Sequence, residues 1–138
     1  MSATANAKYT FGKSVDLGFD EAISRVTEAL GKEGFGVLTE IDVAATLRKK
    51  LGLEMPPYRI LGACNPQFAH KAIEFEPQIG ALLPCNVVVR EEDDGSITVA
   101  FMDPEAVLQL VNRPEVEALA HEVKAKLMRV RDSLVEKS

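Results

Sequence analysis

The sequence is short of the side chains that most often carry redox, metal or acid–base chemistry. Its 138 residues include two cysteines, Cys64 and Cys85, and two histidines, His70 and His121. Two cysteines are too few for a disulfide framework, and their separation fits neither a Cys-x-x-Cys redox motif nor a four-cysteine zinc site. Both histidines fall on the polar side of predicted helices, so no Ser-His-Asp or Cys-His arrangement has a well-placed base.

Positive charge and long apolar runs are lacking as well. The net charge is −5 and the pI is about 5.1, which argues against non-specific nucleic-acid binding, because that requires a basic surface. No apolar run approaches the ~20 residues that cross a bilayer. The first eight residues also lack the basic and apolar regions of a secretory signal. We therefore expect a soluble, cytoplasmic protein with no nucleic-acid or membrane partner.

The common motifs of nucleotide and hydrolase chemistry are missing too. The sequence contains no GxGxxG, GxxxxGK[ST], HExxH or GxSxG pattern, and each of these places defined groups around a phosphate, a metal or a nucleophile. Without them, catalysis is less expected than binding. The sequence names no reaction and no cofactor.

What is present is the composition of one ordinary globular domain, which we assign to residues 1–138. Hydrophobic residues make up 46% and charged residues 27%, and a chain of this length can bury a core. Alternation, turn and capping signals predict the order β-α-β-(α)-β-α-β-β-α. The predicted fold is α+β, with a mixed or mainly antiparallel sheet and helices packed on one face. Strands are predicted at 8–15, 35–43, 58–64, 85–91 and 96–102, with the last helix at 114–138.

The last predicted helix carries a regular apolar seam with two interpretations. The spacing alternates between four and three residues, as in a heptad repeat. The seam either packs on the sheet of its own chain or contacts a second copy. Its members are Val116, Ala120, Val123, Leu127, Val130 and Leu134.

Two short segments, "GACNP" at 62–66 and "LPCNV" at 83–87, pair a cysteine with an asparagine beside a proline. Asn65 followed by Pro66 is typical of a helix start. If the strands that carry Cys64 and Cys85 are antiparallel neighbours, the two thiols lie at the same end of the sheet. If a crossover joins these strands, the thiols lie at opposite ends.

The blocks "GFGVLTEIDV", "YRILGACNP", "LLPCNVVVRE" and Asp103-Pro104 resemble the family catalogued as domain of unknown function 302, over about residues 34–104. This resemblance implies a compact α+β domain and a dimer, and it implies no established reaction. It also marks Cys64–Pro66 and Pro84–Asn86 as family signature positions.

The leading hypothesis is a non-enzymatic small-ligand-binding or regulatory module that forms a homodimer. Its pocket is predicted where the two Cys-Asn segments meet. The alternatives are a thiol-based redox or soft-metal protein that uses Cys64 and Cys85, and a purely structural or dimerisation protein. The candidate binding residues are Cys64, Asn65, Pro66, Gly80, Pro84, Cys85 and Asn86.

A secondary candidate site involves Glu40, Asp42 and Arg59. The two carboxylates are two residues apart on a predicted strand, so they share one face about 6.5–7 Å apart. Such a pair suits acid–base work or a hard cation. The alternative is that Arg48 or Arg59 neutralises them.

Overall fold

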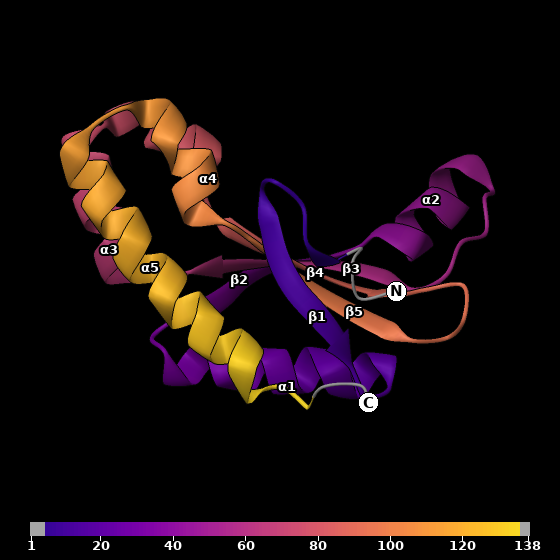
Figure 1. Cartoon of the computed structure of the whole chain (residues 1–138). Helices are drawn as coiled ribbons and strands as arrows, with labels where there is room; N and C mark the ends of the chain where they lie inside the picture. Colours follow the sequence, from indigo (N-terminus) through magenta and orange to yellow (C-terminus); the bar gives the residue numbers. More distant parts are fainter. Residues whose placement is uncertain (1–4, 136–138) are drawn as a thin grey trace.

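The computed structural model describes residues 5–135, and its centre is a five-stranded sheet in the order β1-β5-β4-β3-β2 (Figure 1). Every neighbouring pair of strands is antiparallel. The predicted α+β class is therefore confirmed. The strands are β1 (Thr10–Val15), β2 (Gly36–Asp42), β3 (Tyr58–Cys64), β4 (Cys85–Glu91) and β5 (Ile97–Met102).

The helices are divided unequally between the two sides of the sheet. In Figure 1, α5 crosses α1 on one side, whereas α2 projects from the other. No helix in the described part of the chain is long and apolar enough to span a membrane. The helices are α1 (Phe19–Lys32), α2 (Val43–Leu51), α3 (Pro66–Phe75), α4 (Pro104–Leu108) and α5 (Pro114–Ser133), with 3-10 turns η2 (Pro77–Leu82) and η3 (Gln109–Val111).

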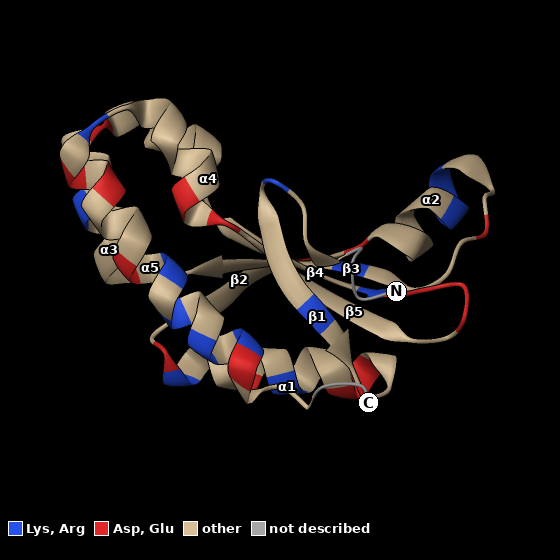
Figure 2. Cartoon of the chain, in the orientation of Figure 1, with Lys and Arg blue, Asp and Glu red and all other residues tan. Residues whose placement is uncertain are grey.

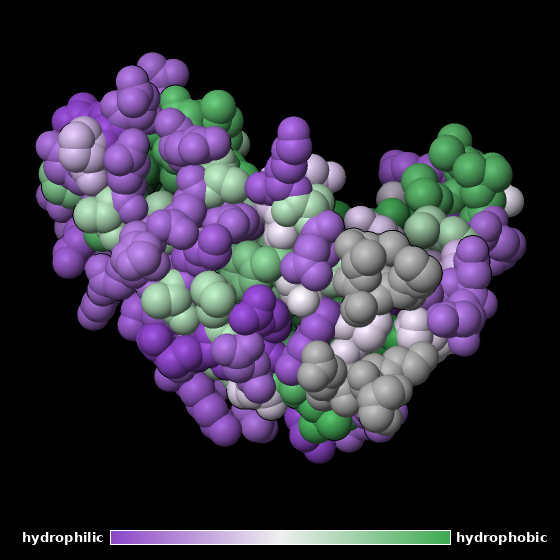
Figure 3. Space-filling model, in the orientation of Figure 1, coloured by the Kyte–Doolittle hydropathy of each residue, from purple (hydrophilic) through white to green (hydrophobic). Residues whose placement is uncertain are grey.

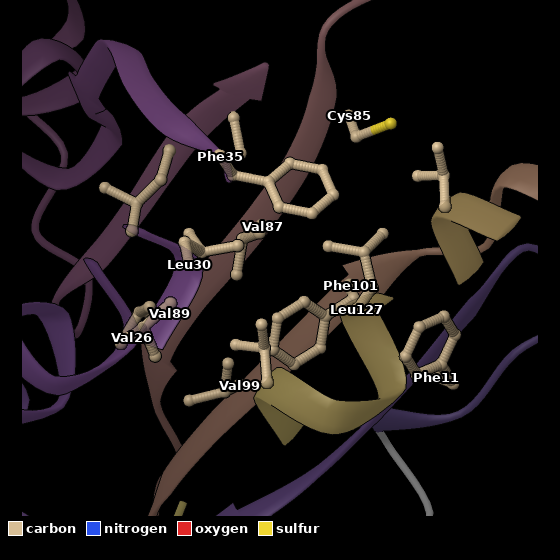
Figure 4. Close-up of a cluster of buried hydrophobic side chains, with 14 of the residues drawn as sticks. Phe11, Val26, Leu30, Phe35, Cys85, Val87, Val89, Val99, Phe101 and Leu127 are labelled. Carbon is tan, nitrogen blue, oxygen red and sulfur yellow. The ribbon is translucent and has the colours of Figure 1, made fainter. Parts of the chain in front are cut away.

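The hydrophobic core lies between the inner face of the sheet and helices α1 and α5 (Figure 4). Phe101 on β5 is fully buried and stacks on Phe11 of β1, with ring centroids 5.6 Å apart. All six residues of the C-terminal apolar seam are buried within this same chain. The seam therefore packs onto its own core, and the interpretation of it as a dimer contact is wrong. Residues 136–138 of the predicted helix lie outside the described part.

Local signals place the ends of the elements near the candidate site. The side chain of Asn65 accepts a hydrogen bond from the Phe68 amide at 3.2 Å and caps α3. Asp103 caps α4 in the same way, with Pro104 at the first helical position. The predicted β4–β5 hairpin turns at Gly95, whose φ of 87° suits glycine.

The two edge strands of the sheet differ in how they are covered. Four of the six residues of β1 are buried, and neighbouring backbone contacts its edge. In β2, every residue except Val37 is exposed. The register of β2 against β3 shifts between Val37 and Thr39, as at a β-bulge. The sheet is therefore closed at one edge and open at the other.

Candidate functional site: an apolar pocket beside the open edge

The structure decides between the two arrangements of the Cys-Asn segments. Strands β3 and β4 are antiparallel neighbours, and Ala63 lies directly opposite Cys85. The end of β3 and the start of β4 therefore lie at the same end of the sheet. The two segments come together, as the antiparallel alternative requires.

Where these segments meet, the structure has a pocket of about 270 Å³, which we call the apolar pocket. The predicted residues that line it are Cys64, Asn65, Gly80, Pro84 and Cys85. Figure 4 shows two of its wall residues, Phe35 and Cys85, at the same end of the core cluster. The pocket is thus an extension of the core that reaches the surface beside β2.

Two of the predicted binding residues lie elsewhere. Pro66 lines a neighbouring cavity of about 410 Å³ between α3, α5 and the end of α1. Asn86 is exposed on β4 opposite Gly62, so its amide is open to solvent and needs no buried partner. Charged residues of both signs border the larger cavity, among them Glu33, Lys71 and Lys126. That cavity is a polar surface groove and not a desolvated site.

Most of the pocket wall comes from apolar residues that the sequence analysis did not single out. They are Phe35, Leu38, Ala63, Phe68, Ala69, Ile73 and Leu83. Ala69 and Ile73 stand four residues apart on α3, so they share one helix face. That spacing was a usable signal, but it marks any apolar helix face and does not distinguish a pocket from a core.

The thiol of Cys85 is held in its neutral form. Its side chain is only 4% exposed, and burial raises its pKa to about 12, with the charge of Cys64 as a lesser cause. A buried neutral thiol is a poor nucleophile and a poor metal ligand. Cys85 therefore acts in this pocket as a small apolar wall residue.

The alternative in which Cys64 and Cys85 form a shared thiol site is not supported. Both cysteines are free, and Cys85 shares a sheet face with its partner Ala63. Cys64 is the last residue of β3 and also lines the pocket, but no bond joins the two thiols. Within the described residues, no group of three or more His, Cys, Asp or Glu side chains is placed to hold a metal.

The two carboxylates of the secondary candidate site, Glu40 and Asp42, both form ion pairs with an arginine. The Arg59 guanidinium binds Glu40 and also Asp42, the latter at 3.3 Å, and stacks 5.5 Å from the ring of Phe19. Asp42 also caps α2 by accepting a hydrogen bond from the Ala45 amide at 2.8 Å. The single guanidinium balances one of the two negative charges, and these contacts leave both carboxylates a structural role at the end of β2.

Comparison with known proteins assigns the chain to a family. Residues 11–134 match the family described as Domain of unknown function DUF302. The chain is similar to an uncharacterized conserved DUF302 protein from Bacillus stearothermophilus, whose crystal structure is 32% identical with a TM-score of 0.84. That similarity covers 91% of this chain and 98% of the Bacillus chain.

A shorter similarity links the chain to an uncharacterized protein from Aquifex aeolicus (strain VF5). The two are 30% identical over 50 residues, which is 36% of this chain and 35% of the relative. The match thus spans about a third of that curated relative's length. The near-complete family match is what decides the assignment: this chain belongs to the DUF302 family.

Proposed function

We propose that this protein is a binding module whose apolar pocket takes a small neutral molecule, or the apolar end of a larger one. The observation that carries the proposal is the convergence of two Cys-Asn segments on one core-connected pocket of about 270 Å³. A water-excluding wall with few polar groups is the usual form of a small-molecule site.

The volume indicates the size of the ligand. An engineered apolar cavity of about 150 Å³ stays dry and binds benzene. The pocket here is larger, at about 270 Å³, so a single aromatic ring or a chain of about six carbons fits. Asn65 and Cys64 are the polar residues at its margin, and both suit a neutral polar end better than a full charge.

The wall also favours binding over thiol chemistry. The neutral state of Cys85, with its pKa near 12, removes one of the two thiolates that the redox and soft-metal alternatives require. Apart from Cys64, no other wall residue is a titratable nucleophile or base. Selective association is the activity that these side chains support.

The test is a titration of the 15N-labelled full chain with benzene, hexan-1-ol and hexanoate, followed by amide chemical shifts. We expect saturable shifts around Cys64, Ala69 and Cys85, with the neutral compounds binding more tightly than hexanoate. Ala69→Leu fills the pocket and should weaken binding at least about tenfold, the equivalent of 1.4 kcal/mol.

Ala125→Leu is the matched control, because Ala125 is exposed on α5 and is not in the pocket wall. It makes the same change on a helix surface and should bind like the parent. Shifts that never saturate, or equal binding by both variants, would overturn the proposal.

A further inference from the structure

The apolar pocket shares part of its wall with the cavity of about 410 Å³ between α3, α5 and the end of α1, which we call the polar groove. Asn65 and Phe68 line both spaces. In the turn before β2, Gly34 lines the polar groove, and the next residue, Phe35, lines the apolar pocket. The two spaces therefore adjoin at two separate segments of the chain. A molecule too long for the apolar pocket would continue into the polar groove.

Asn65 stands at this boundary with its amide held in one orientation. Its Oδ1 accepts a hydrogen bond from the Phe68 amide at 3.2 Å, so the cap of α3 fixes which end of the side chain is Nδ2. A Cβ at Gly34 would lie 3.4 Å from Nδ2, which places Nδ2 on the groove side of the boundary. Within residues 5–135, no protein atom accepts a hydrogen bond from Nδ2, and this atom is not buried. Asn65 therefore offers a bound molecule a hydrogen-bond donor.

This donor discriminates between the polar groups that a ligand could place at the boundary. A carbonyl oxygen accepts from Nδ2 and needs no acceptor in return, whereas a hydroxyl group also carries a donor that Asn65 does not satisfy. A free carboxylate accepts as well, but it would bring a full charge to the edge of an apolar wall, which is costly. A neutral carbonyl is therefore the group that fits best.

The polar groove suits a polar extension beyond that carbonyl. It is lined by side chains of both signs, namely Glu33, Lys71, Glu122 and Lys126. Arg129 binds Glu33 at 2.9 Å, so the charge of Glu33 is already balanced. Figure 2 shows both signs of charge along α5, and Figure 3 shows a mostly hydrophilic surface over this helix. This lining favours a group that forms hydrogen bonds and carries little net charge.

We propose that the ligand is an acyl compound, in which an acyl chain of about six carbons is joined through an amide or an ester to a polar remainder. The acyl chain lies in the apolar pocket, the carbonyl oxygen accepts a hydrogen bond from Nδ2 of Asn65, and the remainder lies in the polar groove. This inference rests on the proposed function, because it needs the apolar pocket to bind a ligand. It adds the chemical class of that ligand and makes Asn65 the residue that determines specificity.

The first test compares three compounds on the full chain by isothermal titration calorimetry. The probe is N-hexanoylglycinamide, which combines a six-carbon acyl chain, an amide carbonyl and a neutral polar remainder. It should bind at least about fivefold more tightly than hexan-1-ol or hexanoate, because it adds a matched hydrogen bond and contacts in the groove.

Substitutions at Asn65 test the donor without removing the helix cap. Asn65→Asp caps a helix as well as asparagine does, but it replaces Nδ2 with an acceptor oxygen. It should weaken N-hexanoylglycinamide at least about tenfold and reduce its preference over benzene, which uses no hydrogen bond. Asn65→Ser, another capping residue, should reduce the same preference without adding charge.

Asn86→Asp is the matched control for these substitutions. It makes the same change and adds the same charge at an exposed residue of β4, outside both walls, so it should bind N-hexanoylglycinamide like the parent. Circular dichroism verifies that each variant is folded. Asn65 variants that bind N-hexanoylglycinamide as tightly as the parent would overturn the proposal, as would an equal loss in Asn86→Asp.

Intermolecular NOEs to the methyl-labelled chain test the position of the ligand. The acyl methyl group should lie near Ala69 and Ile73 of the apolar pocket, and the glycinamide near Leu119 and Val123 of the polar groove. Both ends in one cavity would contradict the inference. If hexan-1-ol binds with saturation and N-hexanoylglycinamide binds no more tightly, the acyl class is wrong and the proposed function stands. If none of the compounds binds, both are wrong.

Discussion

The two edge strands of the sheet differ in how far they are covered by the rest of the chain. β1 is a largely buried strand whose outer face is occupied by the segment around Asn6 and by the end of the chain near Val135. β2 is paired along one side only, with β3, and is exposed along nearly its whole length. The apolar pocket and the unburied helix α2 both adjoin β2. This fold therefore buries one edge strand and leaves the other exposed.

Different contacts hold each edge in place. Near β1, Lys124 of α5 binds Asp103 at 2.9 Å and lies 5.9 Å above the ring of Phe11. Beyond β2, the chain turns into α2, whose main partner in the chain is β3. Removing a contact at β1 therefore disturbs the core, whereas removing one at β2 exposes little that was buried.

The largest expected effect comes from emptying the core beside β1. Phe101→Ala removes a fully buried ring and should lower the free energy of unfolding by about 3–5 kcal/mol. Leu38→Ala, at β2, should change it by less than about 0.5 kcal/mol, because its side chain is already exposed. Urea unfolding of both variants measures this. Equal losses would break the comparison between the edges.

The next largest difference in stability is expected between the two aspartates that cap helices. Asp103→Ala loses two amide hydrogen bonds and a half-buried ion pair with Lys124, at a cost of about 2 kcal/mol. Asp42→Ala loses an exposed cap and should cost about 1 kcal/mol. Thermal unfolding compares the two, and a more damaging Asp42 variant would contradict the ranking.

A tight contact on the β2 side sharpens the comparison. A Cβ at Gly62 would lie 2.2 Å from Thr39 Oγ1 and 3.0 Å from Pro84 Cγ. Gly62→Ala should therefore cost about 1–2 kcal/mol through overpacking. Gly36→Ala, with nothing within 4 Å of its Cβ, should be nearly neutral in urea unfolding. Adding Thr39→Ala to Gly62→Ala should recover part of the loss. No recovery would mean that Pro84 makes the limiting contact.

The smallest expected effect is a pH dependence between α4 and α5. A hydrogen bond from His121, then one from Lys124, lowers the pKa of Glu105 below 4.5. A lowered carboxyl pKa contributes stability that is present above pH 4.5 and is lost as the pH falls through the folded-state value. Glu105 is substantially exposed, so Glu105→Gln should cost a few tenths of a kcal/mol at pH 7 and nothing near pH 3. Glu74→Gln, at a surface pair with His70, is the control. A loss that persists at pH 3 would contradict this assignment.

The parts of the fold that depend on short-range sequence signals were predictable. Asn65-Pro66 and Asp103-Pro104 each begin a helix, and the Asp-Gly turn forms its hairpin. The apolar seam of the last helix also identified core residues correctly. These features depend on residues a few positions apart, so spacing alone reveals them.

The site was predictable only in part, because it depends on pairing between distant segments. The sequence allowed two arrangements of the Cys-Asn segments. They lie together if their strands are antiparallel neighbours and apart if a crossover joins the strands, and the sequence did not decide between these topologies. It likewise left open whether Cys64 and Cys85 form one site, because the pairing of two strands also decides which side chains share a face. The wall residues Leu38 and Ile73 come from separate elements, β2 and α3. Only the folded chain brings them together in the wall of one pocket.

The proposed function requires that the apolar pocket beside the open edge holds no ordered water before a ligand binds. Xenon binds such cavities and scatters anomalously, so a crystal of the full chain under xenon pressure tests the claim directly. We expect xenon between Ala63, Ala69 and Cys85 in the parent protein, and none there in Ala69→Leu. Ordered water in that space, or a pocket filled by Leu38 and Ile73 with no xenon, would contradict it.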